Sequence, residues 1–514
     1  MLGITSSFDE KVTLEAFGIY NNIKMNIYRP LTYAQVSDID AYYDFDFSEN
    51  PDEYDYYGYN RNGFDDLMLL GIVSVNFSER TKITFKPYFW NDLGYYLETV
   101  TQANGQNRIR RWDIDHDLFG GLFEFSGEWA GVHYGVGYLY HNQQRPGPPT
   151  SWKIYRIVSG QLEFDKYNLL SNRSRYELNS PLITAKYSLG PVSFDGGLRF
   201  VHFRLPPIIT YKADSTRGDI SHDDALDRNP PVDEAASARD PKTLNGLFPN
   251  LTVTGKLNRR FAVYGSYGRN YVTHVDIYPY FISQRTMFQR AGITFDKLWK
   301  DREMEFSHNL ELGMRYESDL MSLVPVVYYS VHQNKQAVLY DPALDATYPR
   351  NDASAAGYGG EIEAKVNPFN YLLFYGSLSY NRFYFTQDIN SDRDSSILHI
   401  KRYQVPDAPE FLAKALLTFR MKGFAVSPIV RYMSKRYGDV PHKEEIGAST
   451  AFDIDFSYSR SLLLLKNIEV TVRLMNILNR KDVALINTSD YKTLKTSYQP
   501  VAPFTIMGSV AVTY

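Results

Sequence analysis

The 514-residue sequence contains no cysteine and no long uninterrupted run of apolar residues. The absence of cysteine excludes disulfide bonds, but it fits a cell-envelope protein and a cytosolic one equally well. The absence of apolar runs excludes a membrane-spanning helix, which needs about 20 consecutive apolar residues. With 22% charged residues and a mean hydropathy of −0.37, hydropathy alone would describe a soluble protein.

Positive charge and tryptophan are also scarce. The net charge of −4 gives no reason to expect nucleic acid as a partner. Tryptophan occurs 5 times, whereas 42 tyrosines and 31 phenylalanines raise the aromatic content to 15%. Because a tyrosine ring is apolar and its hydroxyl needs a polar partner, this abundance favours a structure with much interfacial surface. A chain this long must form several domains, repeat a unit or close a very large sheet.

Apolar and polar residues alternate at period two along nearly the whole chain. From Phe452 to Ser459, four aromatic or aliphatic residues alternate with Asp and Ser. The same alternation occurs around Val192–Phe200, Leu310–Tyr316, Leu372–Tyr380 and Ile468–Leu474. Since successive side chains of a strand point to opposite faces, the pattern predicts strands with one apolar and one polar face.

Connector length alternates as well. The expected short connectors are Ser78–Thr81, Ala130–Gly131, Gly190–Pro191, Asn258–Arg259, Ser318–Asp319, Pro368–Phe369, Lys422–Gly423 and Lys466–Asn467. The long polar stretches between them are Leu31–Asn62, Pro206–Asn245, Thr273–Arg302, Asp388–Lys401 and Val440–Ser449. Short turns on one side and long loops on the other are typical of outer-membrane barrels, and a soluble sandwich has no reason to sort its loops in this way.

The C-terminal segment is an apolar strand that ends in an aromatic residue. Phe504, Ile506, Val510, Val512 and Tyr514 share one face, and we interpret them as the signal read by the barrel-assembly machinery. Lipid cannot satisfy backbone hydrogen bonds, so a sheet in a membrane must close on itself. The sequence therefore predicts an all-β fold, a large antiparallel transmembrane β-barrel of the bacterial outer membrane with about eighteen strands present.

Five segments carry a resemblance to one family: Val405–Phe411, Arg431–Asp439, Val472–Lys481, Gly359–Glu363 and Glu311–Arg315. In order and spacing from the C-terminus they resemble strands of the TonB-dependent outer-membrane receptors. The resemblance implies a barrel of about 22 strands around a globular plug. It also implies import of a scarce ligand, such as a ferric siderophore or cobalamin, driven by the TonB–ExbB–ExbD complex through an N-terminal TonB box.

The beginning of the chain departs from that family. Neither a plug nor a TonB box is recognisable, and Met1 is followed by no secretory signal. Leu2–Thr5 reads as the end of one strand, and the first complete strand is expected from Lys11 to Ile27. We therefore interpret residues 1–514 as an N-terminally truncated receptor barrel whose plug is absent. Energised uptake, and contact with TonB through the missing region, would belong to the parent protein, and the fragment alone is expected to be unstable or to gape.

No loop offers a recognisable metal, cofactor or catalytic site. The acidic, tyrosine-rich stretch Asp38–Tyr59 could hold Ca²⁺, but its spacing is not that of an EF-hand and we favour a solvated loop. The polar loop Asp214–Asp240 contains the triplet Arg217-Gly218-Asp219, which we interpret as a chance occurrence. The ten histidines have no metal-ligand spacing, so neither a metal nor a cofactor is expected.

Charged residues inside the expected strands should face the lumen, because lipid near the midplane disfavours charge. They are Arg199, Glu311, Arg315, Glu361, Glu363 and Arg473. They would either contact a plug and a ligand path or pair with each other across strands, and we favour pairing.

Three other functions compete with the receptor. A passive porin-like channel is the main alternative, because it would need no plug. An outer-membrane enzyme is disfavoured because no nucleophile–base set is recognisable, and a soluble repeat protein is disfavoured by the sorted loops. The expected partners are outer-membrane lipid, the barrel-assembly machinery and a small-molecule metal chelate, and no nucleic acid. The sequence does not identify the ligand or the residues that bind it.

Overall fold

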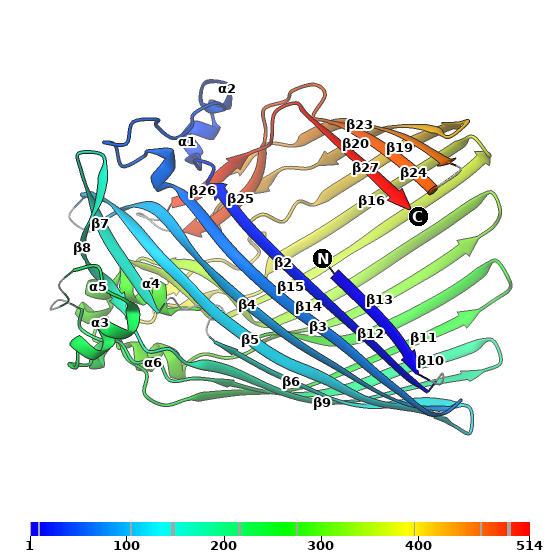
Figure 1. Ribbon diagram of the computed structural model, residues 1–514, viewed down its shortest axis with the longest axis horizontal. Helices are drawn as coiled ribbons and strands as arrows, with labels where there is room; N and C mark the ends of the chain where they lie inside the picture. The colour runs from blue at the N-terminus through cyan, green and yellow to red at the C-terminus, as the bar shows by residue number, and fades with distance from the viewer. Residues whose placement is uncertain are drawn as a thin grey trace.

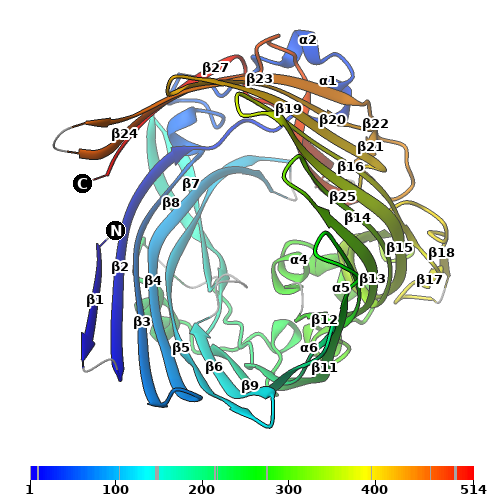
Figure 2. The same cartoon turned by 90° about the vertical axis from the view of Figure 1, so that its right-hand side faces the viewer.

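The computed structural model describes residues 2–8, 11–102, 105–144, 150–213, 216, 218–273, 276–394, 396–462, 465–490 and 495–513. Their main element is one antiparallel sheet of 21 strands. The sheet curls around an open lumen and forms most of a ring (Figure 1 and Figure 2). No helix of the described ranges is both long enough and apolar enough to cross a membrane.

Nineteen of the strands form the wall of the ring, and consecutive ones are paired antiparallel. Their bounds are β1 (Leu2–Phe8), β2 (Val12–Asn26), β3 (Arg61–Ser78), β4 (Thr81–Thr101), β5 (Asn107–Trp129), β6 (Val132–Gln144), β9 (Arg175–Leu189), β10 (Val192–Leu205), β11 (Lys242–Lys256), β12 (Phe261–Val272), β13 (Glu305–Glu317), β14 (Met321–Asp341), β15 (Ala346–Phe369), β16 (Leu372–Phe385), β19 (Phe411–Met421), β20 (Phe424–Met433), β23 (Ser449–Leu462), β24 (Leu465–Met475) and β27 (Thr505–Thr513). The remaining two, β7 (Ser151–Val158) and β8 (Gln161–Leu170), form a hairpin that pairs with the first residues of β5.

The connections are sorted by length between the two ends of the ring. The long ones lie together at the left of Figure 1 and carry all the short elements. These are α1 (Tyr33–Val36), α2 (Ile39–Tyr42), η1 (Tyr57–Tyr59), α3 (His222–Arg228), η2 (Glu234–Ala236), α4 (Tyr278–Ser283), α5 (Arg285–Arg290) and α6 (Phe295–Lys300), with the pairs β17 (Ile389–Asn390) and β18 (Ile397–Leu398), β21 (Arg436–Tyr437) and β22 (Glu445–Ile446), and β25 (Val483–Asp490) and β26 (Lys495–Pro500). The predicted antiparallel barrel fold with sorted loops is confirmed.

Two expected turns fall within strands. Pro368–Phe369 lies at the end of β15, and Phe369 pairs with Leu372, so the turn is formed by residues 370 and 371. Lys466–Asn467 lies inside β24, where Asn467 pairs with Thr513. In both places residue types common in turns are retained within a strand, because cross-strand pairing outweighs local turn preference.

The outer face of the wall is apolar and uncovered. Leu312 and Val327 lie opposite each other on β13 and β14 and are 61% and 57% exposed. The same face continues through the last strand, where Ile506, Val510 and Val512 lie opposite Leu474, Val470 and Ile468. Phe504 precedes this strand and is also exposed, whereas Tyr514 lies outside the described residues. Their reading by the assembly machinery stays a prediction.

The wall has two edges. Among the described residues β1 pairs with β2 alone and β27 with β24 alone, and Figure 2 shows the opening between them. Elsewhere the ladder is continuous from strand to strand. The strands carry the long connections to one end, which we call the mouth.

Candidate functional site

The charges predicted to face the lumen lie on the polar face of the wall. Arg473 on β24 makes two hydrogen bonds of 2.7 Å with Asp455, directly opposite on β23. Glu311 accepts a hydrogen bond of 2.7 Å from Tyr264, and Glu361 accepts one of 3.2 Å from Ser379. Arg199, Arg315 and Glu363 share the face of these residues, opposite the exposed apolar side chains. Arg473 thus forms a cross-strand ion pair, as predicted, whereas Glu311 and Glu361 bond to uncharged hydroxyls on the neighbouring strands.

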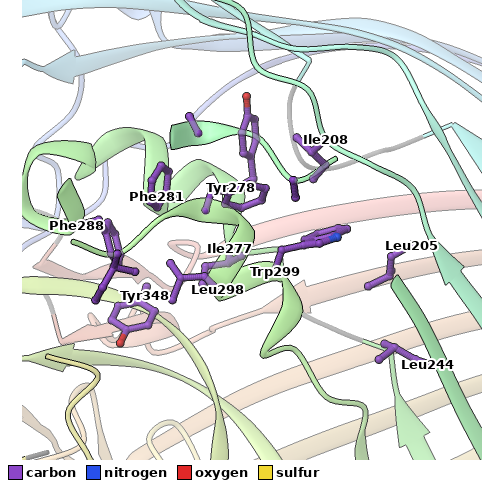
Figure 3. Close-up of a cluster of buried hydrophobic side chains, with 14 of the residues drawn as sticks. Leu205, Ile208, Leu244, Ile277, Tyr278, Phe281, Phe288, Leu298, Trp299 and Tyr348 are labelled. Carbon is purple, nitrogen blue, oxygen red and sulfur yellow. The ribbon is translucent and has the colours of Figure 1, made fainter. Parts of the chain in front are cut away.

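One half of the mouth is covered by an aromatic core. We call the described residues of 206–241 and 273–304 the aromatic cap. Phe281 stacks on Phe288 at 5.0 Å between ring centroids and lies 5.6 Å from Phe295, which in turn lies 5.8 Å from Trp299. These rings are almost completely buried (Figure 3). Figure 2 shows α4 and α5 within the outline of the ring, so the cap reduces the opening of the lumen.

Buried hydrogen bonds fasten the aromatic cap to β15. The Gln284 side chain donates to the carbonyl of Thr347 at 2.6 Å and accepts from its amide at 2.7 Å. The Arg302 guanidinium donates to the carbonyl of Pro349 at 2.8 Å. Because buried donors and acceptors are costly to leave unpaired, these contacts fix the cap in one position.

A network of buried charges joins the cap to the other half of the mouth. Tyr348 packs 5.3 Å from Phe288 of the cap and donates a hydrogen bond to Asp392 on the facing loop. Beside it, Arg350 pairs with Asp352 at 2.6 Å and lies 3.7 Å from the buried carboxylate of Asp341. Burial raises the pKa of Tyr348 above the ordinary range of a tyrosine, so its hydroxyl remains a donor.

The other half of the mouth contains a cavity of about 710 Å³, which we call the mouth cavity. Its lining comes from five separate connections: Thr32, Tyr33 and Ala34; Tyr340 and Pro342; Ile397, Leu398, His399, Ile400 and Tyr403; Asp439, Val440, Pro441, Lys443 and Glu444; and Thr496. The volume lies within the range of about 300–1,000 Å³ typical of small-molecule sites. Such a cavity exists only because the loops are held against each other.

The lining combines aromatic rings with charges of both signs. Tyr33, Tyr340 and Tyr403 supply rings with hydroxyls, and Lys443 supplies an exposed cation. The acidic side is fixed: the buried Tyr498 donates to Glu444 at 2.6 Å. Burial, and then this hydrogen bond, raise the pKa of Tyr498. The arrangement can stack on flat ligands and hydrogen-bond to their polar groups.

A second carboxylate shapes the loop that borders the mouth cavity. Asp388 accepts hydrogen bonds from the amides of Lys401 at 2.8 Å and Ile400 at 2.9 Å, and it contacts His399 at 3.2 Å. The amide of Lys401 first, and then His399, hold the pKa of Asp388 below its ordinary value. The ionised carboxylate therefore closes the base of this loop.

The loops singled out from the sequence have structural roles. In the acidic stretch, Asp55 pairs with Arg29 at 2.9 Å, and the guanidinium of Arg29 lies 3.9 Å from the centre of the Phe45 ring. Across the described ranges no group of three or more His, Cys, Asp or Glu is arranged to hold a metal ion. Asp219 of the Arg-Gly-Asp triplet accepts 2.7 Å hydrogen bonds from Lys153 and Tyr155; Arg217 and Asp214 lie outside the described residues.

The mouth cavity itself was not predicted from the sequence. Its residues come from five loops separated by up to several hundred positions, and none belongs to a short motif with a fixed spacing. The only local signal is the length and polarity of the loops, which indicates where a site can form but not which side chains meet.

Comparison with known proteins agrees with this architecture. Residues 7–479 match the family model described as TonB dependent receptor-like, beta-barrel. No curated protein sequence matches the chain significantly.

Solved structures share the fold at low sequence identity. The ferric citrate transporter FecA in its unliganded form is 14% identical with a TM-score of 0.70, and the match covers 98% of this chain and 68% of that one. The siderophore receptor PiuA from Acinetobacter baumannii is 14% identical with a TM-score of 0.69, covering 99% and 73%. The copper transporter OprC is 11% identical with a TM-score of 0.65, covering 99% and 70%.

The match to the family model spans most of the chain, and the fold is that of outer-membrane receptors. The apolar outer face is therefore the lipid-facing surface, and the mouth, with its long loops, is the extracellular end. This chain belongs to the TonB-dependent receptor β-barrel family of the bacterial outer membrane.

Proposed function

We propose that the protein binds a small metal chelate, such as a ferric siderophore or cobalamin, at the mouth cavity and takes it up with energy from TonB. The observation that carries the proposal is the cavity itself, about 710 Å³ at the extracellular end of a barrel of this receptor family. Sites of this kind bury most of a small ligand and use a few polar groups to orient it.

The composition of the lining supports a chelate as the ligand. Tyr33, Tyr340 and Tyr403 provide stacking surface for planar groups, and Lys443 provides a cation for an acidic one. The known structures that share the fold include a ferric citrate transporter, a siderophore receptor and a copper transporter.

We further propose that residues 1–514 form one receptor barrel domain. The continuous antiparallel ladder from β1 to β27 supports this proposal. In this proposal the C-terminal strand is the segment read by the assembly machinery.

Uptake of labelled chelates by cells that produce the protein tests the receptor against a passive channel. The probes are ⁵⁵Fe-labelled ferric citrate, a ⁵⁵Fe-labelled ferric catecholate and labelled cobalamin, each with and without an uncoupler. Saturable uptake of one probe that the uncoupler abolishes supports the receptor. Uptake that rises in proportion to concentration and ignores the uncoupler would instead support the porin-like alternative.

Substitutions assign that uptake to the mouth cavity. Tyr403→Ala and Lys443→Ala should each weaken binding of the transported probe about tenfold, as expected for residues that contact a ligand directly. Lys256→Ala is the matched control, since this exposed lysine lies at the opposite end of the wall. Equal uptake in all three variants would contradict the assignment.

A further inference from the structure

Two loops supply most of the mouth cavity. Residues 386–410 and 434–448 contribute ten of its sixteen lining residues, so the distance between these loops sets its width. Residues 402–405 of the first loop pair with β16, where Gln404 lies opposite Tyr384 and the amide of Phe385 donates to the carbonyl of Tyr403. Beyond its base, the second loop pairs within itself through β21 and β22. Contacts between the second loop and residues 402–405 therefore help to set the separation of the loops.

The bases of the two loops are joined by a buried ion pair. Arg436 is 4% exposed and donates to Asp407 at 2.8 Å and to the carbonyl of Val483 at 2.7 Å. The amide of Asp407 also donates to the carbonyl of Tyr437 at 2.9 Å. This attachment fixes the loops where they leave the wall but not where they enclose the cavity.

A histidine in the turn of the 434–448 loop contacts residues 403 and 404 of the other loop. Beside it, Leu398, Ile400 and Val440 of the two loops belong to one buried apolar cluster. The imidazole of His442 stacks on Tyr437 of its own loop at 3.9 Å between centroids and 10° between planes. Its other side faces Tyr403 of the neighbouring loop at 5.1 Å and 29°. The ring nitrogen Nε2 lies 3.0 Å from the carbonyl oxygen of Gln404. Because a carbonyl oxygen only accepts, Nε2 carries the hydrogen and donates it. His442 thus connects both loops through stacking and through a hydrogen bond.

His442 lies in a turn and has an unusual backbone conformation. His442 has φ of 59°, in the left-handed region that non-glycine residues adopt at a cost. Its amide is 3.4 Å from the carbonyl of Asp439, whose carboxylate accepts from the amide of Glu444 at 2.9 Å. The turn therefore carries Pro441 and Lys443, on either side of His442, into the cavity lining.

We propose that His442 is the positioning residue that holds these two loops at the separation required for ligand binding. It does not line the cavity; it acts through Tyr403 and Lys443, which do. The effect of this loop separation on ligand binding rests on the proposed function. The separation itself exists without any ligand.

The loop separation can be measured directly in the ligand-free protein. The chain has no cysteine, so Ile397→Cys and Lys443→Cys place two spin labels specifically, one on each loop. The distance distribution between the labels should be narrow with His442 present, broad in His442→Ala and narrow again in His442→Phe, which retains the stack. An unchanged distribution in His442→Ala overturns the proposal.

A second histidine serves as the control. His399 lines the same cavity, but its side chain is 77% exposed and contacts Asp388 of its own loop, so His399→Ala should leave the distance distribution unchanged. Broadening in His399→Ala equal to that in His442→Ala would mean that any histidine loss loosens the loops, and would overturn the specific role of His442.

Ligand affinity provides the functional readout, in a background without the labels. For whichever ferric chelate or cobalamin the protein transports, His442→Ala should weaken binding about tenfold and His442→Phe should restore most of it, since preorganised loops reduce the ordering cost of binding. If no probe binds the wild-type protein, the proposed function fails while the label distances still decide the role of His442. If the label distances respond but affinity does not, His442 holds the two loops at a separation that binding does not require, and the proposal is overturned.

Discussion

The two halves of the mouth are both made of long loops, but different contacts hold them. The aromatic cap has its own buried core of rings around Phe281 and Phe295, and buried hydrogen bonds fasten it to β15. The loops around the mouth cavity share only small apolar clusters and are joined by individual polar contacts, such as Arg436–Asp407 and Tyr498–Glu444. A cap with its own apolar core and a cavity enclosed by individually joined loops therefore lie next to each other on one barrel.

This difference shows how one barrel can place the contacts that stabilise its loops and the contacts that shape its binding cavity in different segments. Buried apolar area stabilises the cap, and the buried hydrogen bonds of Gln284 and Arg302 fix its position on β15. Polar contacts between loops are directional and few, so each one affects the geometry of the cavity. Binding surfaces are generally drawn from such less stable segments.

The largest expected effect comes from the core of the cap. Phe295→Ala removes a fully buried ring and should destabilise the cap by about 3–5 kcal/mol. Hydrogen–deuterium exchange should accelerate in 278–300 and remain unchanged in 434–448. Phe295→Leu, which fills more of the space, should give a smaller effect. Equal acceleration in both segments would show that the halves are not independent.

The network of buried charges between the two halves should be almost as sensitive to substitution. Arg350→Met leaves the buried Asp341 without its nearby cation and should cost about 3 kcal/mol or more, measured by chemical denaturation. The double variant Arg350→Met/Asp341→Asn, which removes both charges, should be less destabilised than Arg350→Met alone. A double variant that is less stable by the sum of both single effects would argue against charge burial as the cause.

A smaller effect is expected inside the cavity half. Tyr498→Phe keeps the buried ring but removes the donor to Glu444, which should cost about 1.5–3 kcal/mol because the acceptor is charged. Exchange should accelerate in 434–448 and not in 278–300. Tyr33→Phe is the control, since its hydroxyl donates a longer bond of 3.3 Å at an exposed position.

The smallest effect is a pH dependence at the base of the 386–410 loop. The pKa of Asp388 is lower in the folded protein than the ordinary value of 3.8 for an aspartate, because the amide of Lys401 and then His399 stabilise the carboxylate. Its stabilisation is therefore fully present above that value and is lost as the pH falls through the folded pKa. The difference in thermal midpoint between wild type and Asp388→Asn should shrink once the pH falls below 3.8. A constant difference across that range would contradict this assignment.

The wall could be predicted from the sequence because every strand repeats the same alternation of apolar and polar residues. Each strand must place apolar residues on one face, so Leu310, Leu312 and Phe456 identify their strands without knowledge of their neighbours. The expected first strand from Lys11 to Ile27 appears as Val12–Asn26. The misplaced turn at Lys466–Asn467 shows the limit, because local turn preference and strand pairing conflict there.

The mouth could not be predicted because its contacts are specific to pairs of distant residues. Nothing near Tyr498 indicates that it meets Glu444, and nothing near His442 indicates that it inserts between Tyr403 and Tyr437. The helices of the cap were read only as a long polar loop, since α4, α5 and α6 have six residues each and their burial depends on one another. Short helices of this kind derive their stability from tertiary packing.

Hydrogen–deuterium exchange with and without the transported chelate is the sharpest test of whether ligand binds the cavity half while the cap stays fixed. The ligand should protect 386–410 and 434–448 and leave 278–300 unchanged. Protection of 278–300 without protection of the two cavity loops would contradict it.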